Sequence, residues 1–127
     1  MIQEAYCSFE VAKLLKEKGF DIPVNYEYHY KISIPQFHKK KHNFNGIEYR
    51  NCSSEWCSAP THQMAIAWIV EKYNIFIEVS ILKHNCWAYT IHKILSNKVE
   101  ELYNDGEFKS HEEAVESALK YYLTNLI

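Results

Sequence analysis

A segment that is apolar on almost every side constrains the fold of this chain more than any other feature of its sequence. Residues 64–70 are all apolar and lie within a longer stretch, 61–73, whose pattern is helical. A helix on a protein surface keeps one polar face, so a helix without such a face is covered on more than one side. The sequence therefore predicts a central core helix, with Thr61 as its N-cap.

Alternation of apolar and polar residues marks three strands. It runs through residues 26–34, through Ile75–Lys83 and through Cys86–Ile94. Residues 84–85, His-Asn, predict a tight turn between the last two strands. These two strands are therefore expected to pair antiparallel, as a hairpin.

Two further signals concern turns. Asn-Gly at residues 45–46 predicts a hairpin between a strand near 40–44 and one near 47–51, because a type I′ turn needs positive φ at both central residues. Asp-Gly at residues 105–106 predicts another turn, after a helical turn at 99–103. Together with the alternating segments, these signals predict an antiparallel sheet of about four to five strands.

Helices are predicted at both ends of the chain by their caps. Ser8 can accept the amide hydrogens in the first turn of a helix that Gly19 ends. Ser110 and Glu113 form a capping box for a helix that runs to about Leu123. The predicted order is α-β-(ββ)-α-β-β-α, an α+β fold with three helices packed mainly on one face of the sheet. Residues 1–127 are expected to form a single domain.

Composition fits a globular protein and excludes fibrous, disordered and low-complexity chains. The 127 residues are 47% hydrophobic and 24% charged, with a formal net charge of −2. A chain of this length buries roughly two-thirds of its unfolded surface, so its core needs neither a metal nor a disulfide. The charge is uneven, since residues 38–50 carry +3 and residues 100–116 carry −6. Such segments are typical of solvated faces and also suit the docking of a charged partner.

No segment of the sequence predicts export or membrane insertion. The first residues lack a basic stretch followed by an apolar run, so we expect no secretory signal. The longest apolar run, residues 64–70, is seven residues long, whereas a bilayer span needs about 20. We therefore expect a soluble, cytoplasmic protein with no membrane partner, whose four cysteines are reduced.

Residues 8–15, 59–65, 73–79 and 110–116 carry a resemblance to known proteins. In these segments the chain resembles a group of small proteins, of unassigned activity, that phages and mobile elements of gut bacteria encode. The matching residues are mainly caps and core positions, and the similarity skips residues 35–58. The resemblance implies a phage or mobile-element origin and a shared fold, and it assigns no functional residues.

Histidines and cysteines with a spacing that could hold zinc occur between residues 38 and 62. They are His38, His42, Cys52, Cys57 and His62. Zinc takes four nitrogen or sulfur ligands in a tetrahedron, and imidazoles and thiolates suit it. The four residues between Cys52 and Cys57 are at the edge of the usual spacing. The alternative is that these cysteines are reduced loop thiols and the histidines are solvated.

A basic and aromatic patch predicts a second kind of site. Lysines attract phosphates, and aromatic rings stack on unpaired bases. The patch comprises Lys39, Lys40 and Lys41 with Tyr26, Tyr28 and Tyr30. The alternative is that the tyrosine face is buried, and the negative net charge favours it because dedicated nucleic-acid binders are basic. Exposure of the three tyrosines to solvent distinguishes the two hypotheses.

Motifs of known enzymes do not occur in the sequence, which has no nucleophile elbow, phosphate loop or HExxH motif. Cys86 and His92 would share a strand face about 20 Å apart, too far for a catalytic dyad. The leading hypothesis is a small non-enzymatic binding or accessory protein without a cofactor. Its partner would be another protein or a second copy of itself, met through a sheet edge or exposed aromatic residues. The alternatives are a nucleic-acid-associated accessory protein and a zinc-stabilised module.

Overall fold

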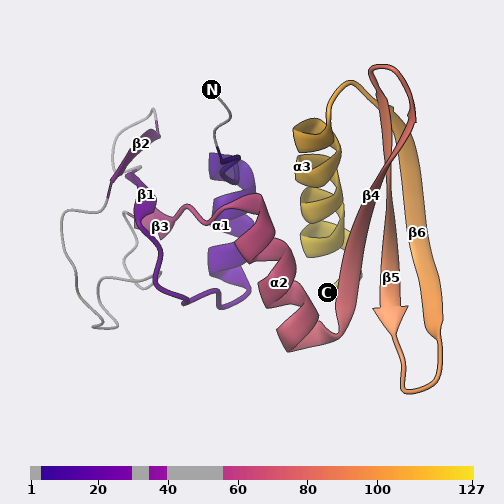
Figure 1. The fold of residues 1–127 in the computed structure, drawn as a ribbon. Helices are drawn as coiled ribbons and strands as arrows, with labels where there is room; N and C mark the ends of the chain where they lie inside the picture. Colours follow the sequence, from indigo (N-terminus) through magenta and orange to yellow (C-terminus); the bar gives the residue numbers. More distant parts are fainter. Residues whose placement is uncertain (1–3, 30–34, 40–55) are drawn as a thin grey trace. The chain divides into compact units, whose positions relative to one another are not determined.

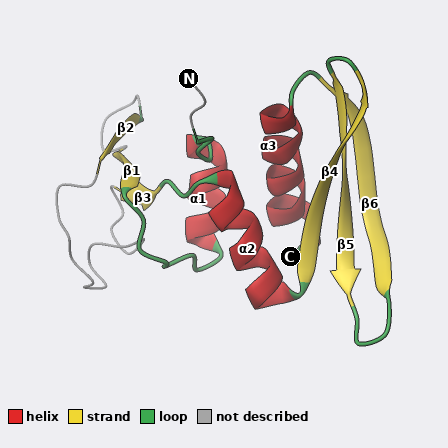
Figure 2. Cartoon of the chain, in the orientation of Figure 1, coloured by secondary structure: helices red, strands yellow, loops and turns green. Residues whose placement is uncertain are grey.

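The computed structural model describes residues 4–29, 35–39 and 56–127 (Figures 1 and 2). The chain divides into two compact units, Met1–Thr61 and His62–Ile127, and each is described by itself. Both units contain helix and antiparallel strand, so the predicted α+β class is confirmed. In place of one sheet of about four to five strands, the described strands form two sheets of three strands each. Alternation predicts that a segment is a strand, but which strands pair depends on contacts between distant residues.

The unit Met1–Thr61 begins with helix α1 (Phe9–Glu17). Ser8 caps the helix as predicted, because its Oγ accepts a hydrogen bond from the Val11 amide at 3.2 Å. Gly19 follows the helix with a φ of 90°, which glycine adopts without strain. One face of the helix is buried, at Val11, Ala12 and Leu15.

A three-stranded antiparallel sheet in the order β2-β1-β3 belongs to the same unit. Its strands are β1 (Tyr26–His29), β2 (Gln36–Lys39) and β3 (Trp56–Ser58). Helix α1 packs against β3, where Lys16 Nζ donates a hydrogen bond to the Trp56 carbonyl at 2.8 Å. Residues 30–34 of the first predicted strand and the predicted hairpin at 40–51 lie outside the described residues.

The unit His62–Ile127 begins with helix α2 (His62–Tyr73), directly after Thr61. Ala65, Trp68 and Ile69 are buried, while the other apolar residues of this helix range from half-buried to exposed. The predicted apolar helix is therefore present, and it is more deeply buried on one side than its all-round apolar pattern indicated.

Three antiparallel strands follow in the order β4-β5-β6. They are β4 (Ile75–Lys83), β5 (Cys86–Ile94) and β6 (Val99–Phe108). The bounds of β4 and β5 are those predicted from alternation, and the turn between them lies at His84 and Asn85 as predicted. Asn85 takes a φ of 55°, a region that asparagine visits more readily than most residues.

Strand β6 corrects two predictions. The helical turn expected at 99–103 and the turn expected at Asp105-Gly106 are both strand. Pairing with β5 outweighs the local preference of these residues, and β6 accommodates the Asp-Gly pair in a β-bulge within the strand. Glu107, directly after the glycine, takes the positive φ of 70° that the bulge requires.

Helix α3 (His111–Tyr121) packs on this second sheet and contacts all three of its strands (Figure 1). Ser110 caps the helix as predicted, since its Oγ accepts a hydrogen bond from the Glu113 amide at 3.1 Å. The helix continues as a π-helix, η2 (Tyr122–Leu126), past the predicted end at Leu123. The buried side chains of the strands and of α3 include Ile77, Tyr89, Ile91, Val115 and Leu119.

The helices are divided between the two sheets. Helix α1 packs against the first sheet and α3 against the second, so the prediction that three helices gather on one face of a single sheet is wrong. The sequence patterns identify each helix and its apolar face, but they do not pair that face with a sheet. Among residues 4–29, 35–39 and 56–127, no helix has both the length and the apolar content needed to cross a bilayer.

Replacing Ser110 with alanine should lower the free energy of unfolding by about 1 kcal/mol, because the Glu113 amide loses its acceptor. Urea unfolding followed by circular dichroism measures the change. Ser110→Asp is the matched control and should unfold like the wild type, since aspartate also caps helices. If Ser110→Ala were as stable as Ser110→Asp, the cap would contribute nothing to the fold.

Candidate functional site

A groove of about 270 Å³ lies beside helix α3 in the unit His62–Ile127. Strands β5 and β6 line one side of it, and α3 and η2 line the other. All of its lining residues therefore belong to one unit of the chain. They combine aromatic rings with groups that donate or accept hydrogen bonds, which is the usual composition of a ligand pocket.

Four aromatic rings line the groove in two stacked pairs. Tyr103 of β6 stacks on Tyr121 of α3, with ring centroids 3.8 Å apart and an interplanar angle of 8°. Tyr89 of β5 stacks on Phe108 of β6, with centroids 5.6 Å apart and an angle of 28°. Tyr89 is buried, while the other three rings are half-buried and keep part of their surface accessible. The groove is thus a rigid aromatic surface that joins sheet to helix.

The bulge in β6 brings two of the lining residues together. Tyr89 pairs with Asp105 and Trp87 pairs with Phe108, so Gly106 and Glu107 together lie opposite the single residue between Trp87 and Tyr89. In a regular strand, residues 105 and 108 would point to opposite faces because they are an odd number of positions apart. The extra residue puts both of them on the face of Tyr89. The groove exists in this form because the strand is irregular there.

A second irregularity lies on the helical side of the groove. Thr124 and Asn125 line it from the π-helix η2, and Asn125 Nδ2 donates a hydrogen bond to the Tyr121 carbonyl at 3.3 Å. π-Helical turns are rare, and many of those that do occur are found at functional sites. Ser117 and Lys120 of α3 complete this side, so Lys120 and Asp105 give the groove one positive and one negative charge.

Two tyrosines of the groove, Tyr89 and Tyr103, are neutral hydrogen-bonding groups near pH 7. Burial raises the pKa of Tyr89, and the nearby Tyr103 and Asp105 raise it further. The pKa of Tyr103 is raised by desolvation and by the charge of Asp105. The phenols therefore keep their protons at neutral pH and can donate hydrogen bonds to a ligand.

Of the residues predicted to bind zinc, the structure describes His38, Cys57 and His62. His38 lies in β2 opposite Glu27, and Cys57 lies in β3 opposite Tyr28. Because Glu27 and Tyr28 are neighbours in β1, His38 and Cys57 point to opposite faces of the sheet. His42 and Cys52 lie outside the described residues, and His62 belongs to the other unit. The zinc site stays a prediction.

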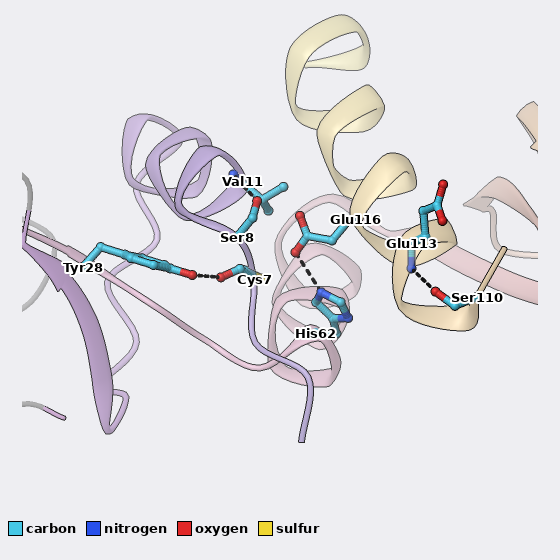
Figure 3. Close-up of polar contacts among 8 residues, drawn as sticks. All are labelled: Cys7, Ser8, Val11, Tyr28, His62, Ser110, Glu113 and Glu116. Carbon is cyan, nitrogen blue, oxygen red and sulfur yellow. Dashed lines mark hydrogen bonds and ion pairs between the residues drawn. The ribbon is translucent and has the colours of Figure 1, made fainter. Parts of the chain in front are cut away.

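His62 has a polar partner within its own unit. Its Nε2 lies 2.8 Å from Glu116 Oε1, which joins the start of α2 to α3 (Figure 3). The side chain of His62 is buried, and its Nδ1 has no hydrogen-bond partner among the described residues. The hydrogen bond to Glu116 gives His62 a role in holding the two helices together.

The residues predicted to bind nucleic acid are partly described. Tyr26 stacks on Phe37 with centroids 5.1 Å apart, and Tyr28 donates a hydrogen bond from its hydroxyl to the Cys7 carbonyl at 2.7 Å (Figure 3). Both tyrosines are half-buried, and Lys39 is exposed opposite Tyr26. Tyr30, Lys40 and Lys41 lie outside the described residues. The contacts of Tyr26 and Tyr28 reduce the ring surface left for stacking on bases, and the nucleic-acid site stays a prediction.

No protein-family model matches this chain, and neither a curated protein nor a solved structure matches it. The resemblance to proteins of phages and mobile elements therefore stays a prediction. Any function has to be argued from the residues themselves. The groove is the strongest basis for that argument, although the sequence did not indicate it. The available signal was the Asp105-Gly106 pair, which marks an irregularity of the backbone but does not distinguish a turn from a bulge.

The unit that holds the groove should lose stability in alkaline solution. Burial raises the pKa of Tyr122 to about 12, so its phenol keeps its proton where an unfolded chain has lost it. This contribution to stability is complete below pH of about 10, the ordinary pKa of tyrosine, and is lost as the pH approaches about 12. Thermal unfolding at increasing pH measures the loss. Tyr122→Phe, which keeps the ring, should show a weaker dependence, and an equal dependence would contradict the assignment.

Cys57 should resist alkylation in the folded protein. Its side chain is buried, and burial raises the pKa of its thiol to about 11, which keeps the reactive thiolate scarce at neutral pH. Cys86 is half-buried and should react faster with iodoacetamide, as peptide mass spectrometry would show. Faster labelling of Cys57 than of Cys86 would contradict this placement.

Metal analysis tests the zinc hypothesis separately, since less than about half an equivalent counts against a structural site.

Proposed function

We propose that this protein is a small non-enzymatic binding protein and that its groove receives a segment of another protein. One observation carries the proposal: the bulge at Gly106 and Glu107 turns Asp105 and Phe108 onto the same face as Tyr89. Glu107 accepts a φ of 70°, which is costly for a residue other than glycine. Backbone strain of this kind persists where the surroundings impose it, and it clusters at ligand sites.

The residue types in the groove support protein recognition. Tyrosine supplies large, rigid contact area, and serine, threonine and asparagine supply adaptable hydrogen bonds, a mixture that also dominates antibody binding loops. The tyrosine rings come from both sides of the groove, at Tyr103 and Tyr121, and the hydroxyls and amide come from Ser117, Thr124 and Asn125.

The volume of the groove favours a few side chains over a cofactor. At about 270 Å³, the groove lies just below the range of roughly 300 to 1,000 Å³ that small-molecule sites occupy. A partner segment that lays a few aromatic or aliphatic side chains against the exposed edges of the stacked rings would fill it. The Asp105 carboxylate and the Lys120 ammonium group would then form hydrogen bonds with polar groups of the partner segment.

The same lining gives little support to catalysis. Among the described residues that line the groove there is no cysteine or histidine. Tyr89 and Tyr103 have raised pKa values, so they are poorly matched to proton transfer near neutral pH. The proposed class is therefore a binding or accessory protein, and its phage or mobile-element origin is a proposal that rests on the resemblance alone.

Thr124→Arg should block the groove without removing a core side chain, because Thr124 is exposed. Peptides are first selected from a displayed random library on immobilised wild-type protein. Fluorescence anisotropy then compares their affinities for the variants. We expect enriched peptides with an aromatic residue, bound to Thr124→Arg about tenfold more weakly or worse, a loss of about 1.4 kcal/mol.

Ser96→Arg is the matched control, since it adds the same side chain at an exposed position outside the groove. It should bind the selected peptides as the wild type does. Failure to enrich any peptide, or equal binding by Thr124→Arg and Ser96→Arg, would contradict the proposal.

A further inference from the structure

Strand β4 is an edge strand of its sheet. Among the residues that the structure describes, β4 pairs with β5 on one side and with no strand on its other side. Its nine residues include no proline and no glycine. The backbone groups along such an edge are a template for pairing with another strand.

The other edge of the sheet has features that oppose pairing. Strand β6 contains two register shifts and four acidic residues, Glu100, Glu101, Asp105 and Glu107. Bulges and charged side chains are common devices by which proteins protect sheet edges. Strand β4 pairs regularly with β5 from Ile75 to Ile81, and Glu78 is its one charge within that range. The two edges therefore differ in a way that favours association through β4.

One hydrogen bond indicates which backbone groups of β4 point away from β5. The Ile94 amide donates to the Asn74 carbonyl at 2.8 Å, one step beyond the pair Ile75 and Lys93. Hydrogen-bonded and non-hydrogen-bonded pairs alternate along antiparallel strands. Even-numbered residues of β4 therefore bond to β5, and the odd-numbered ones direct their amides and carbonyls outward. The outward set is Ile75, Ile77, Val79 and Ile81.

We propose that two copies of this chain associate through β4, antiparallel and centred on Val79, so that two three-stranded sheets become one continuous sheet. In this register Val79 lies opposite Val79 of the second copy and Ile77 opposite Ile81, both within the part of β4 that pairs regularly with β5. Phe76, Ile81 and Leu82 are 43%, 58% and 62% exposed in the single chain. The pairing covers these apolar side chains and uses the outward backbone groups of both copies.

Glu78 favours this register over the one that is centred on Glu78 itself. With Val79 at the centre, Glu78 lies opposite Ser80 of the second copy. With Glu78 at the centre, two glutamates would face each other at the short spacing of a non-hydrogen-bonded pair, where like charges repel. In its own chain Glu78 Oε1 lies 3.0 Å from His92 Nε2, so the preferred register leaves that contact in place.

Sedimentation velocity of the full chain between about 1 and about 100 µM tests the association. The wild type should shift from monomer towards dimer as its concentration rises. Val79→Pro removes an outward amide at the centre of the pairing and should stay monomeric. Since the Val79 amide points away from β5, circular dichroism of this variant should match that of the wild type.

Two substitutions at Ser80 report the register. Ser80→Lys puts a positive charge opposite Glu78 of the second copy, and Ser80→Glu puts a negative charge there. The two variants should change the dissociation constant of the dimer in opposite directions, each by about fivefold over two symmetric pairs. Asn104→Lys and Asn104→Glu, at an exposed position on β6, are the matched controls and should not change it.

A wild type that stays monomeric at about 100 µM would overturn the proposal, as would changes of equal sign in the two Ser80 variants. The dimer rests on different residues from the groove, so the two proposals can fail separately. Thr124→Arg should dimerise like the wild type, and Val79→Pro should still bind the selected peptides.

Discussion

The pairing of β5 with a bulged β6 is the interaction on which the second unit of this protein depends. Tyr89, at the centre of β5, is almost fully buried and holds Asp105 opposite itself in β6. The extra residue in β6 then turns Phe108 to the same face. Helix α3 packs over this face and stacks Tyr121 on Tyr103. The groove is therefore a direct consequence of one irregular strand pair.

The same strand pair explains why the two sheet edges differ. A bulged, acidic β6 cannot easily receive another strand, whereas β4 pairs with β5 without a register shift from Ile75 to Ile81. The bulge is held by local interactions, since the Gly106 amide donates to Asp105 Oδ1 at 2.8 Å. A Cβ at Gly106 would lie 3.5 Å from the Ala88 Cβ, which is an ordinary contact, so position 106 has room for a side chain. The demanding conformation lies at Glu107, whose φ is 70°.

Structural features that depend only on neighbouring residues could be predicted from the sequence. The caps at Ser8 and Ser110, and the strands β4 and β5 with their turn, have the predicted places because each depends on residues a few positions apart. Strand β6 could not be predicted, since Asp105-Gly106 favours a turn until a partner strand is present. The candidate zinc ligands show a related limit. His38 and Cys57 belong to a series of histidines and cysteines whose spacing in the sequence suggested a zinc site. The alternation of the sheet points these two side chains to opposite faces.

Local sequence patterns predicted the three helices, the caps at Ser8 and Ser110, the strands β4 and β5 and the α+β class, because hydrophobic period and capping act over one or two turns of chain. The tertiary structure alone decided that the strands form two sheets, that β6 carries a bulge, and that Tyr89, Asp105 and Phe108 share a groove with Tyr121. These features follow from which distant residues become neighbours. Which residues become neighbours depends on the free energy of burying whole faces of helices and sheets together. A short segment of sequence does not carry that information.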